Sequence, residues 1–162
     1  MFDNLHEIID GLWLGNIAAA EDVIDLKNKG IKKILTVMNQ EGPNYKTEDG
    51  FIHKKIPIID WSNQNIIKYF GECLDFIKGE DKVLVHCMAG ASRSATIVIA
   101  YLMWNKKMKY KDAMDFVKGK RFIIYPNLGF RDQLKKFEEE LIKNEYDISK
   151  IPFDDITWYP PN

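Results

Sequence analysis

The chain has 162 residues, of which 46% are hydrophobic and 29% are charged, and its formal net charge is −1 at pH 7. These values are typical of one globular domain, and lysines scattered without an aromatic stripe argue against a nucleic-acid-binding protein. No apolar stretch reaches the length of a membrane span, and the N-terminal MFDNLHEIIDG lacks the basic segment of a signal peptide. We therefore expect a cytoplasmic or nuclear protein that binds neither nucleic acid nor membrane.

The cysteines and histidines limit the chemistry. Cys73 and Cys87 are far from the C-x-x-C spacing, which excludes a disulfide framework and a structural zinc site. Cys73 falls on the apolar face of a predicted helix, so core packing is expected, with a redox partnership with Cys87 as the alternative. Only three histidines are present, His6, His53 and His86, which are too few to supply a metal-dependent hydrolase site. We expect chemistry without a metal or other cofactor.

Hydrophobic period and turn residues predict the elements of the chain. In chain order they indicate a strand at 11–15, a helix at 19–30, a strand at 31–38, a polar loop at 39–50, a strand at 51–59, a helix at 65–78 and a strand at 82–87. Further helices are predicted from near Ser92, over 110–120 and after Pro126. The strand–helix–strand start indicates an α/β domain with a central, mostly parallel sheet of four to five strands flanked by helices. Residues 1–145 would form this single domain, and 146–162 an irregular tail.

The stretch VLVHCMAGASRSATIVIAYL, residues 83–102, contains the strongest chemical signal. Cys87 closes an apolar strand, and five residues lead into a helix, so successive N–H groups can form an anion nest at the positive end of the helix dipole. The loop residues predicted to bind phosphate in this way are Met88, Ala89, Gly90, Ala91 and Ser92. Arg93 adds a planar fork that can bind two anionic oxygens, and the same positive potential favours a nucleophilic thiolate. Ser94 can hydrogen-bond the sulfur as it leaves a covalent intermediate.

Cleavage of a phosphate ester also needs a proton donor for the departing oxygen. The best candidate is Asp60, because it follows a neighbouring strand and the carboxyl ends of parallel strands meet at one edge of the sheet. Asp49 precedes its strand, and Asp75 and Asp81 belong to the opposite end of the sheet or to the solvent face. These three are therefore the weaker candidates.

HCMAGASRS resembles the H-C-x-x-G-x-x-R-S signature of the cysteine-dependent protein phosphatases, in particular the dual-specificity branch. LWLGNIAAA, IPIID and RFIIYPNLGFRDQL are also similar to segments of that family, so that the resemblance covers roughly residues 5–142. It implies a protein tyrosine phosphatase-like fold and a phosphorylated protein as substrate. The roles it implies are nucleophile for Cys87, phosphate clamp for Arg93, general acid for Asp60, leaving-group assistant for Ser94, loop orientation for His86 and support of the active-site loops for Asn127.

Departures from the family pattern refine the expected substrate. The segment that deepens the pocket in phosphotyrosine-only relatives is not found, so we expect phosphoserine and phosphothreonine to enter as well as phosphotyrosine. The loop after Cys87 carries no lysine, unlike phosphoinositide-directed relatives, which disfavours a lipid substrate. The predicted function is a metal-independent protein phosphatase with a phosphocysteine intermediate, and a monomer is the default. Two alternatives stay open: a catalytically silent domain that binds phosphorylated residues, and a rhodanese-like sulfurtransferase.

Overall fold

The computed structural model describes residues 3–159 and contains a five-stranded sheet in the order β1-β2-β5-β3-β4. The strands are β1 (Leu5–Ile9), β2 (Leu12–Gly15), β3 (Ile31–Val37), β4 (Ile52–Ile56) and β5 (Lys82–His86). β1 pairs antiparallel with β2, and every other neighbouring pair is parallel. The predicted α/β fold with a mostly parallel sheet is confirmed.

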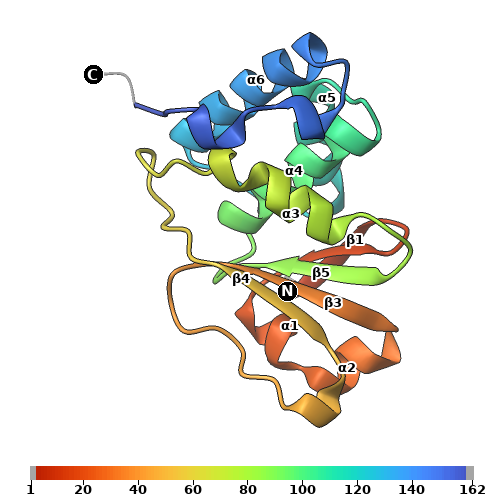
Figure 1. The fold of residues 1–162 in the computed structure, drawn as a ribbon. Coiled ribbons are helices and arrows are strands. Elements are labelled where there is room, and N and C mark those ends of the chain that lie inside the picture. Colours follow the sequence, from red (N-terminus) through yellow and green to blue (C-terminus); the bar gives the residue numbers. More distant parts are fainter. Residues whose placement is uncertain (1–2, 160–162) are drawn as a thin grey trace.

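Helices cover both faces of the sheet (Figure 1). One face carries α1 (Ile17–Glu21) and α2 (Val23–Asn28), and the other carries α3 (Phe70–Ile77), α4 (Arg93–Asn105), α5 (Tyr110–Lys120) and α6 (Leu128–Lys143). Short 3₁₀ helices occur at Thr47–Asp49, Ile67–Tyr69, Ile148–Lys150 and Phe153–Asp155. Because β5 is central and covered on both faces, its sequence is a continuous apolar run.

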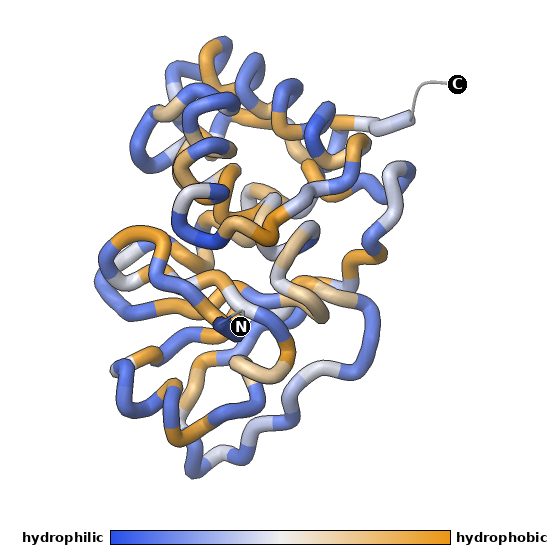
Figure 2. Tube along the Cα trace, turned by 180° about the vertical axis from the view of Figure 1, so that it is seen from behind, coloured by the Kyte–Doolittle hydropathy of each residue, from blue (hydrophilic) through white to orange (hydrophobic). Residues whose placement is uncertain are grey.

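The two layers of helices enclose two hydrophobic cores. The larger core lies between the sheet and α3–α6, and the smaller one, built around Trp13, Leu26 and Ile34, lies under α1 and α2. Bands of hydrophobic and hydrophilic residues alternate along the helices in Figure 2, as expected for helices with one buried face. The exception is α4, which is buried without interruption from Arg93 to Met103 because the sheet and three helices surround it.

In the N-terminal half the structure corrects one prediction and adds one strand. The helix expected over 19–30 is two helices, because the side chain of Asp22 accepts a hydrogen bond from the N–H of Asp25 and so caps a new helix. β1 was not predicted, since its residues LHEII show no clear alternation and only Ile8 is fully buried. β1 is an edge strand held mainly by its antiparallel pairing with β2.

The C-terminal segment packs on the helical layer. The ring of Phe153 lies 6.1 Å from that of Phe137 on α6, and it fits against Gly71, where a side chain would collide with it. The indole of Trp158 donates a hydrogen bond to the carbonyl of Ser62 at 2.8 Å. The proposed division at residue 145 stays a prediction. Within residues 3–159, no helix has the length and apolar character needed to cross a membrane.

Candidate active site

The loop between β5 and α4, residues 87–92, forms the floor of the candidate site. Cys87 is only 2% exposed, and its Sγ lies 3.0 Å from the Oγ of Ser94 in the first turn of α4. Gly90 has φ +66°, and a side chain there would lie 2.6 Å from the carbonyl oxygen of Gly15. Glycine is required for both reasons, and its left-handed conformation redirects the backbone as in anion-binding nests.

The guanidinium of Arg93 is 5% exposed and only partly hydrogen-bonded. Its Nη1 donates to Gln40 Oε1 at 2.8 Å, to Asn39 Oδ1 at 3.1 Å and to the carbonyl of Ile58 at 3.0 Å. Its Nε is buried and has no partner within the described residues. A buried donor without an acceptor is costly, so Nε is the atom of this site that most needs an external oxygen.

Asp60 is held at the loop by two donors. Its Oδ1 accepts hydrogen bonds from Ser92 Oγ at 2.7 Å and from Asn127 Nδ2 at 2.9 Å. The N–H of Asn127 in turn donates to Ser92 Oγ at 3.1 Å, while Asn127 Oδ1 caps α6 through Phe130. Both donors therefore bind the same carboxylate oxygen.

His86 anchors the loop from below through a hydrogen-bonded chain. Its Nδ1 lies 3.2 Å from the carbonyl oxygen of Cys87, and its Nε2 lies 2.7 Å from Thr36 Oγ1, which is also 2.7 Å from His53 Nε2. A carbonyl only accepts, so the network assigns the proton to Nδ1; Thr36 then donates to His86 and accepts from His53. Burial lowers the pKa of His86 to about 4, against a smaller raising effect of the Cys87 carbonyl, so this imidazole is neutral.

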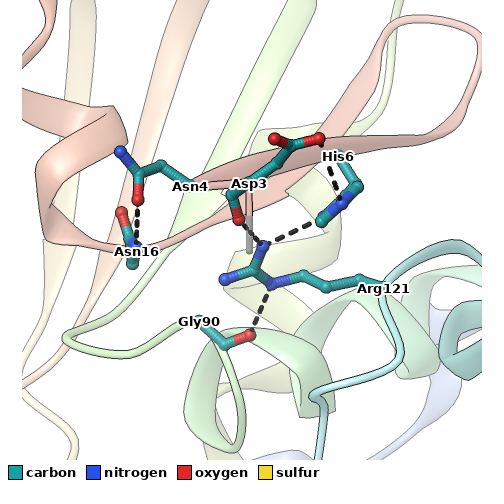
Figure 3. A network of polar contacts seen from close by, with 6 residues as sticks. All are labelled: Asp3, Asn4, His6, Asn16, Gly90 and Arg121. Atoms are coloured by element: carbon teal, nitrogen blue, oxygen red, sulfur yellow. Dashed lines mark hydrogen bonds and ion pairs between the residues drawn. The ribbon is translucent and has the colours of Figure 1, made fainter. Parts of the chain in front are cut away.

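Arg121, just after α5, binds the loop from the side of β1 and β2 (Figure 3). Its Nε donates to the carbonyl of Gly90 at 2.9 Å, and Nη2 to that of Ala89 at 3.2 Å. Nη1 donates to the carbonyl of Asp3 at 2.8 Å and contacts His6 Nδ1 at 3.0 Å. Arg121 is 1% exposed, and burial lowers its pKa. Two loop carbonyls are therefore fixed toward Arg121.

The structure brings together the residues that the sequence singled out. Cys87, Ser94 and Arg93 belong to the loop and the first turn of α4, and Asp60 and Asn127 meet at Ser92. The remaining predicted loop residues, Met88, Ala89, Gly90 and Ala91, lie between Cys87 and Ser92, and His86 supports the loop.

The other candidate acids lie elsewhere. Asp49 is in a 3₁₀ turn 3.7 Å from Lys27, and Asp75 on α3 pairs with Lys78. Asp81 precedes β5, at the end of that strand opposite Cys87. Of these aspartates, only Asp60 is hydrogen-bonded to the loop.

Cys73 lies on α3, fully buried in the larger core. Burial raises the pKa of its thiol well above the ordinary range. This environment agrees with the core role expected for Cys73.

Sequence reasoning missed Arg121, Thr36 and the side-chain role of Ser92. Arg121 contacts the loop because the end of α5 packs beside β1, and no spacing in the sequence indicates that contact. Thr36 carried a weak signal, as a polar residue in the apolar run of β3. Ser92 was expected to act through its N–H, whereas its hydroxyl also joins Asp60 to Asn127.

Comparison with known proteins places this geometry in a family. Residues 12–140 match the model of the dual specificity phosphatase catalytic domain. The chain belongs to the dual-specificity phosphatase family. It is 41% identical over 145 residues to dual specificity protein phosphatase 1B of Arabidopsis thaliana, covering 87% of this chain and 86% of that one. The resemblance noted in the sequence is thereby confirmed.

Solved structures of the family have the same fold. The human tyrosine phosphatase-like serine/threonine/tyrosine-interacting protein is 38% identical, with a TM-score of 0.80, over 85% of this chain and 97% of that one. DUSP15 is 31% identical, also with a TM-score of 0.80, over 90% and 96%. The first name describes a phosphatase-like interacting protein, so catalysis by a dual-specificity phosphatase fold has to be argued from its site.

Proposed function

We propose that this member of the family hydrolyses phosphotyrosine, phosphoserine and phosphothreonine in proteins through a phosphocysteine intermediate, without a metal. One observation carries the proposal: the buried, unpartnered Nε of Arg93 sits one residue from Ser94, whose hydroxyl contacts the sulfur of Cys87. A phosphate oxygen is the acceptor that would satisfy Nε above this thiol. A silent binding domain would also use Arg93, but it would not need the contact between Ser94 and Cys87.

In the first step the thiolate of Cys87 attacks phosphorus, and the bond from phosphorus to the substrate oxygen breaks. Positive potential from the first turn of α4 and from Arg93 stabilises the thiolate and the equatorial oxygens. The proton on Asp60 Oδ2 goes to the departing oxygen, which leaves as an alcohol or phenol. The hydrogen bonds to Oδ1 from Ser92 and Asn127 support this orientation.

In the second step water attacks the phosphocysteine, and the sulfur–phosphorus bond breaks to release inorganic phosphate. The carboxylate of Asp60 takes a proton from the water, which restores the acid for the next turnover. Ser94 Oγ, 3.0 Å from the sulfur, donates a hydrogen bond to the departing thiolate. The carbonyls of Ala89 and Gly90 bind Arg121, which supports keeping the loop N–H groups for the phosphate.

The nucleophile is tested with Cys87→Ser. This variant should lose aryl phosphate turnover and still bind a phosphotyrosine peptide, because the nest and Arg93 remain while a hydroxyl is far less ionised than a thiol. Acid quenching of the native enzyme should trap phosphate on Cys87, and EDTA should leave its turnover unchanged. The matched variant Cys73→Ala should retain turnover, since Cys73 lies in the core.

The outcomes separate the three candidate functions. Turnover that survives in Cys87→Ser contradicts the proposed mechanism. Phosphopeptide binding by the native chain without turnover identifies a silent binding domain. Thiocyanate formation from thiosulfate and cyanide identifies a sulfurtransferase.

A further inference from the structure

Exposed apolar side chains belong to all three segments that build the site. We call them the apolar rim: Ile59 (36% exposed), Trp61 (63%), Met88 (37%), Tyr125 (63%) and Leu128 (65%). Met88 follows Cys87, Ile59 and Trp61 flank Asp60, and Tyr125 and Leu128 lie within two residues of Asn127. Single exposed apolar residues need no explanation, whereas a group of them beside one site marks a surface that binds something.

The three segments are held against one another by hydrogen bonds. Ser92, Asp60 and Asn127 form the triangle described above, and the N–H of Tyr125 donates to the carbonyl of Ala91 at 2.7 Å. Gly129 packs so closely on the backbone of Ser62 that a side chain there would collide. The rim residues are thus carried by segments that contact one another at Ser92, Asp60 and Asn127.

The same segments are poor in charge. Residues 58–62, 87–93 and 125–129 contain only two charged side chains, Asp60 and Arg93. Both are assigned to the chemical step. One further charge touches the rim: the guanidinium of Arg131 lies 4.3 Å over the ring of Tyr125, and its Nε donates to the carbonyl of Pro126. Trp61 and Leu128 each expose more than three fifths of their surface, and this surface would leave water if a polypeptide lay across the site.

We infer that the apolar rim binds apolar side chains two residues before and two residues after the phosphorylated residue of the substrate. The inference rests on the proposed function and is continuous with its site. In an extended polypeptide successive side chains point to opposite faces, so the neighbours at positions −2 and +2 point the same way as the phosphorylated residue. They lie roughly 7 Å from it along the chain, at a rise of about 3.3 Å per residue, so they flank the residue that enters the site.

Three phosphotyrosine peptides test this selectivity. They carry leucine, serine or glutamate at both positions and are otherwise identical. The kcat/KM of the leucine peptide should exceed that of the serine peptide by about tenfold, the low end of the discrimination that an apolar contact gives. The glutamate peptide should also fall below the leucine peptide, since a carboxylate loses water at Trp61 and Leu128 and gains no apolar contact there. Equal values for the three peptides overturn the inference.

A double variant locates the preference on the rim. In Trp61→Ser with Leu128→Ser, the ratio of the leucine to the serine peptide should fall to about one, and using a ratio cancels any general loss of activity. The matched control is Ile24→Ser with Ile142→Ser, which removes two apolar residues that are 75% and 63% exposed, on α2 and near the far end of α6. The control should keep the native ratio, and a fall there contradicts the assignment.

Two further measurements separate a failure of this inference from a failure of the proposed function. If the chain shows no turnover, the proposed function fails, and the same peptide ratio is then measured as dissociation constants by fluorescence anisotropy. The native chain, the rim variant and the control variant are also mixed with neutral phosphatidylcholine vesicles. If the native chain and the control bind and the rim variant does not, the rim is a membrane-binding surface instead. That result, without a peptide preference, overturns the inference.

Discussion

Two buried arginines approach the loop between β5 and α4 from opposite sides of β5. Arg93 contacts Gln40, which follows β3, and Ile58, which follows β4. Arg121 contacts Gly90 in the loop and Asp3 before β1. Each of the Nε, Nη1 and Nη2 atoms of Arg121 has an acceptor, whereas the Nε of Arg93 has none within the described residues. A saturated guanidinium holds structure, and an incompletely bonded one is available to a ligand.

Arg93→Lys should produce the largest effect on turnover. Lysine keeps the charge but cannot bind two oxygens of the transition state, and the loss of two contacts worth roughly 10² each reduces kcat/KM by about 10⁴. The free energy of unfolding should fall by less than in Arg121→Met, because the native Nε is already unsatisfied and the lysine ammonium can keep part of the donation to Gln40, Asn39 and the carbonyl of Ile58. Aryl phosphate kinetics and urea denaturation measure the two quantities. Near-native kinetics would show that Arg93 has no role in the transition state.

Asp60→Asn should give the next largest effect, and only where the leaving group needs a proton. We expect kcat to fall by roughly 10² to 10⁴ for a phosphoserine peptide, the usual range for general acid catalysis. An ester of a strongly acidic phenol should be affected much less, because its oxygen leaves unprotonated. Because the acid must be protonated, the native kcat should fall as the pH rises, and this fall should disappear in the variant. Equal losses for both esters, with the same dependence of kcat on pH as in the native chain, would assign the acid to another residue.

The sequence alone predicts the part of the fold that depends on local patterns. The continuous apolar run of β5, the alternation of β4 and the glycine and arginine after Cys87 each indicate their structure without tertiary information. Local patterns do not predict β1 or the interruption of the helix at Asp22. β1 depends on pairing with β2, and the break depends on one side chain that caps a helix instead of extending it.

The candidate site divides in the same way. Residues near Cys87 in sequence, such as Ser94 and Arg93, were identified from spacing, and Asp60 from the rule that parallel strands end at one edge. Arg121 lies far along the chain, and its contact with Gly90 exists only after α5 packs beside β1. Groups proposed to act in the chemistry are therefore easier to find in this sequence than the groups that hold them.

Arg121→Met sharpens the comparison between the two arginines. Methionine fills similar space but leaves the carbonyls of Gly90, Ala89 and Asp3 without donors, so the free energy of unfolding should fall by about 3 kcal/mol. Turnover should fall less than in Arg93→Lys, because Arg121 acts only through the loop. Urea denaturation and aryl phosphate kinetics of both variants test this: Arg121→Met should lose more stability, and Arg93→Lys more turnover. A stable Arg121→Met with full loss of turnover would mean that Arg121 contacts the phosphate.

The smallest expected effect concerns His86, which supports the loop from the sheet side. Its pKa is lowered by burial from 6.5 to about 4, so the folded chain keeps it neutral where the unfolded chain binds a proton. Above about pH 6.5 both states are neutral, and this residue adds no pH dependence. Between pH 6.5 and 4 the free energy of unfolding should fall on acidification by about 1.4 kcal/mol per pH unit, or about 2 kcal/mol from pH 6.5 to 5.

Urea denaturation at pH 7.5 and pH 5 measures this loss in the native chain and in His86→Asn, which should show a clearly smaller loss because the titrating imidazole is gone. His53→Gln is the matched control. The pKa of His53 is also lowered, by partial desolvation and by the charge of Lys55, but this residue on β4 is exposed, so its removal should reduce the loss much less. The hydroxyl of Thr36 can serve either neighbour as donor or acceptor, which keeps the His53 variant folded. An equal loss on acidification in native chain and His86→Asn would show that His86 is not held neutral beneath the loop.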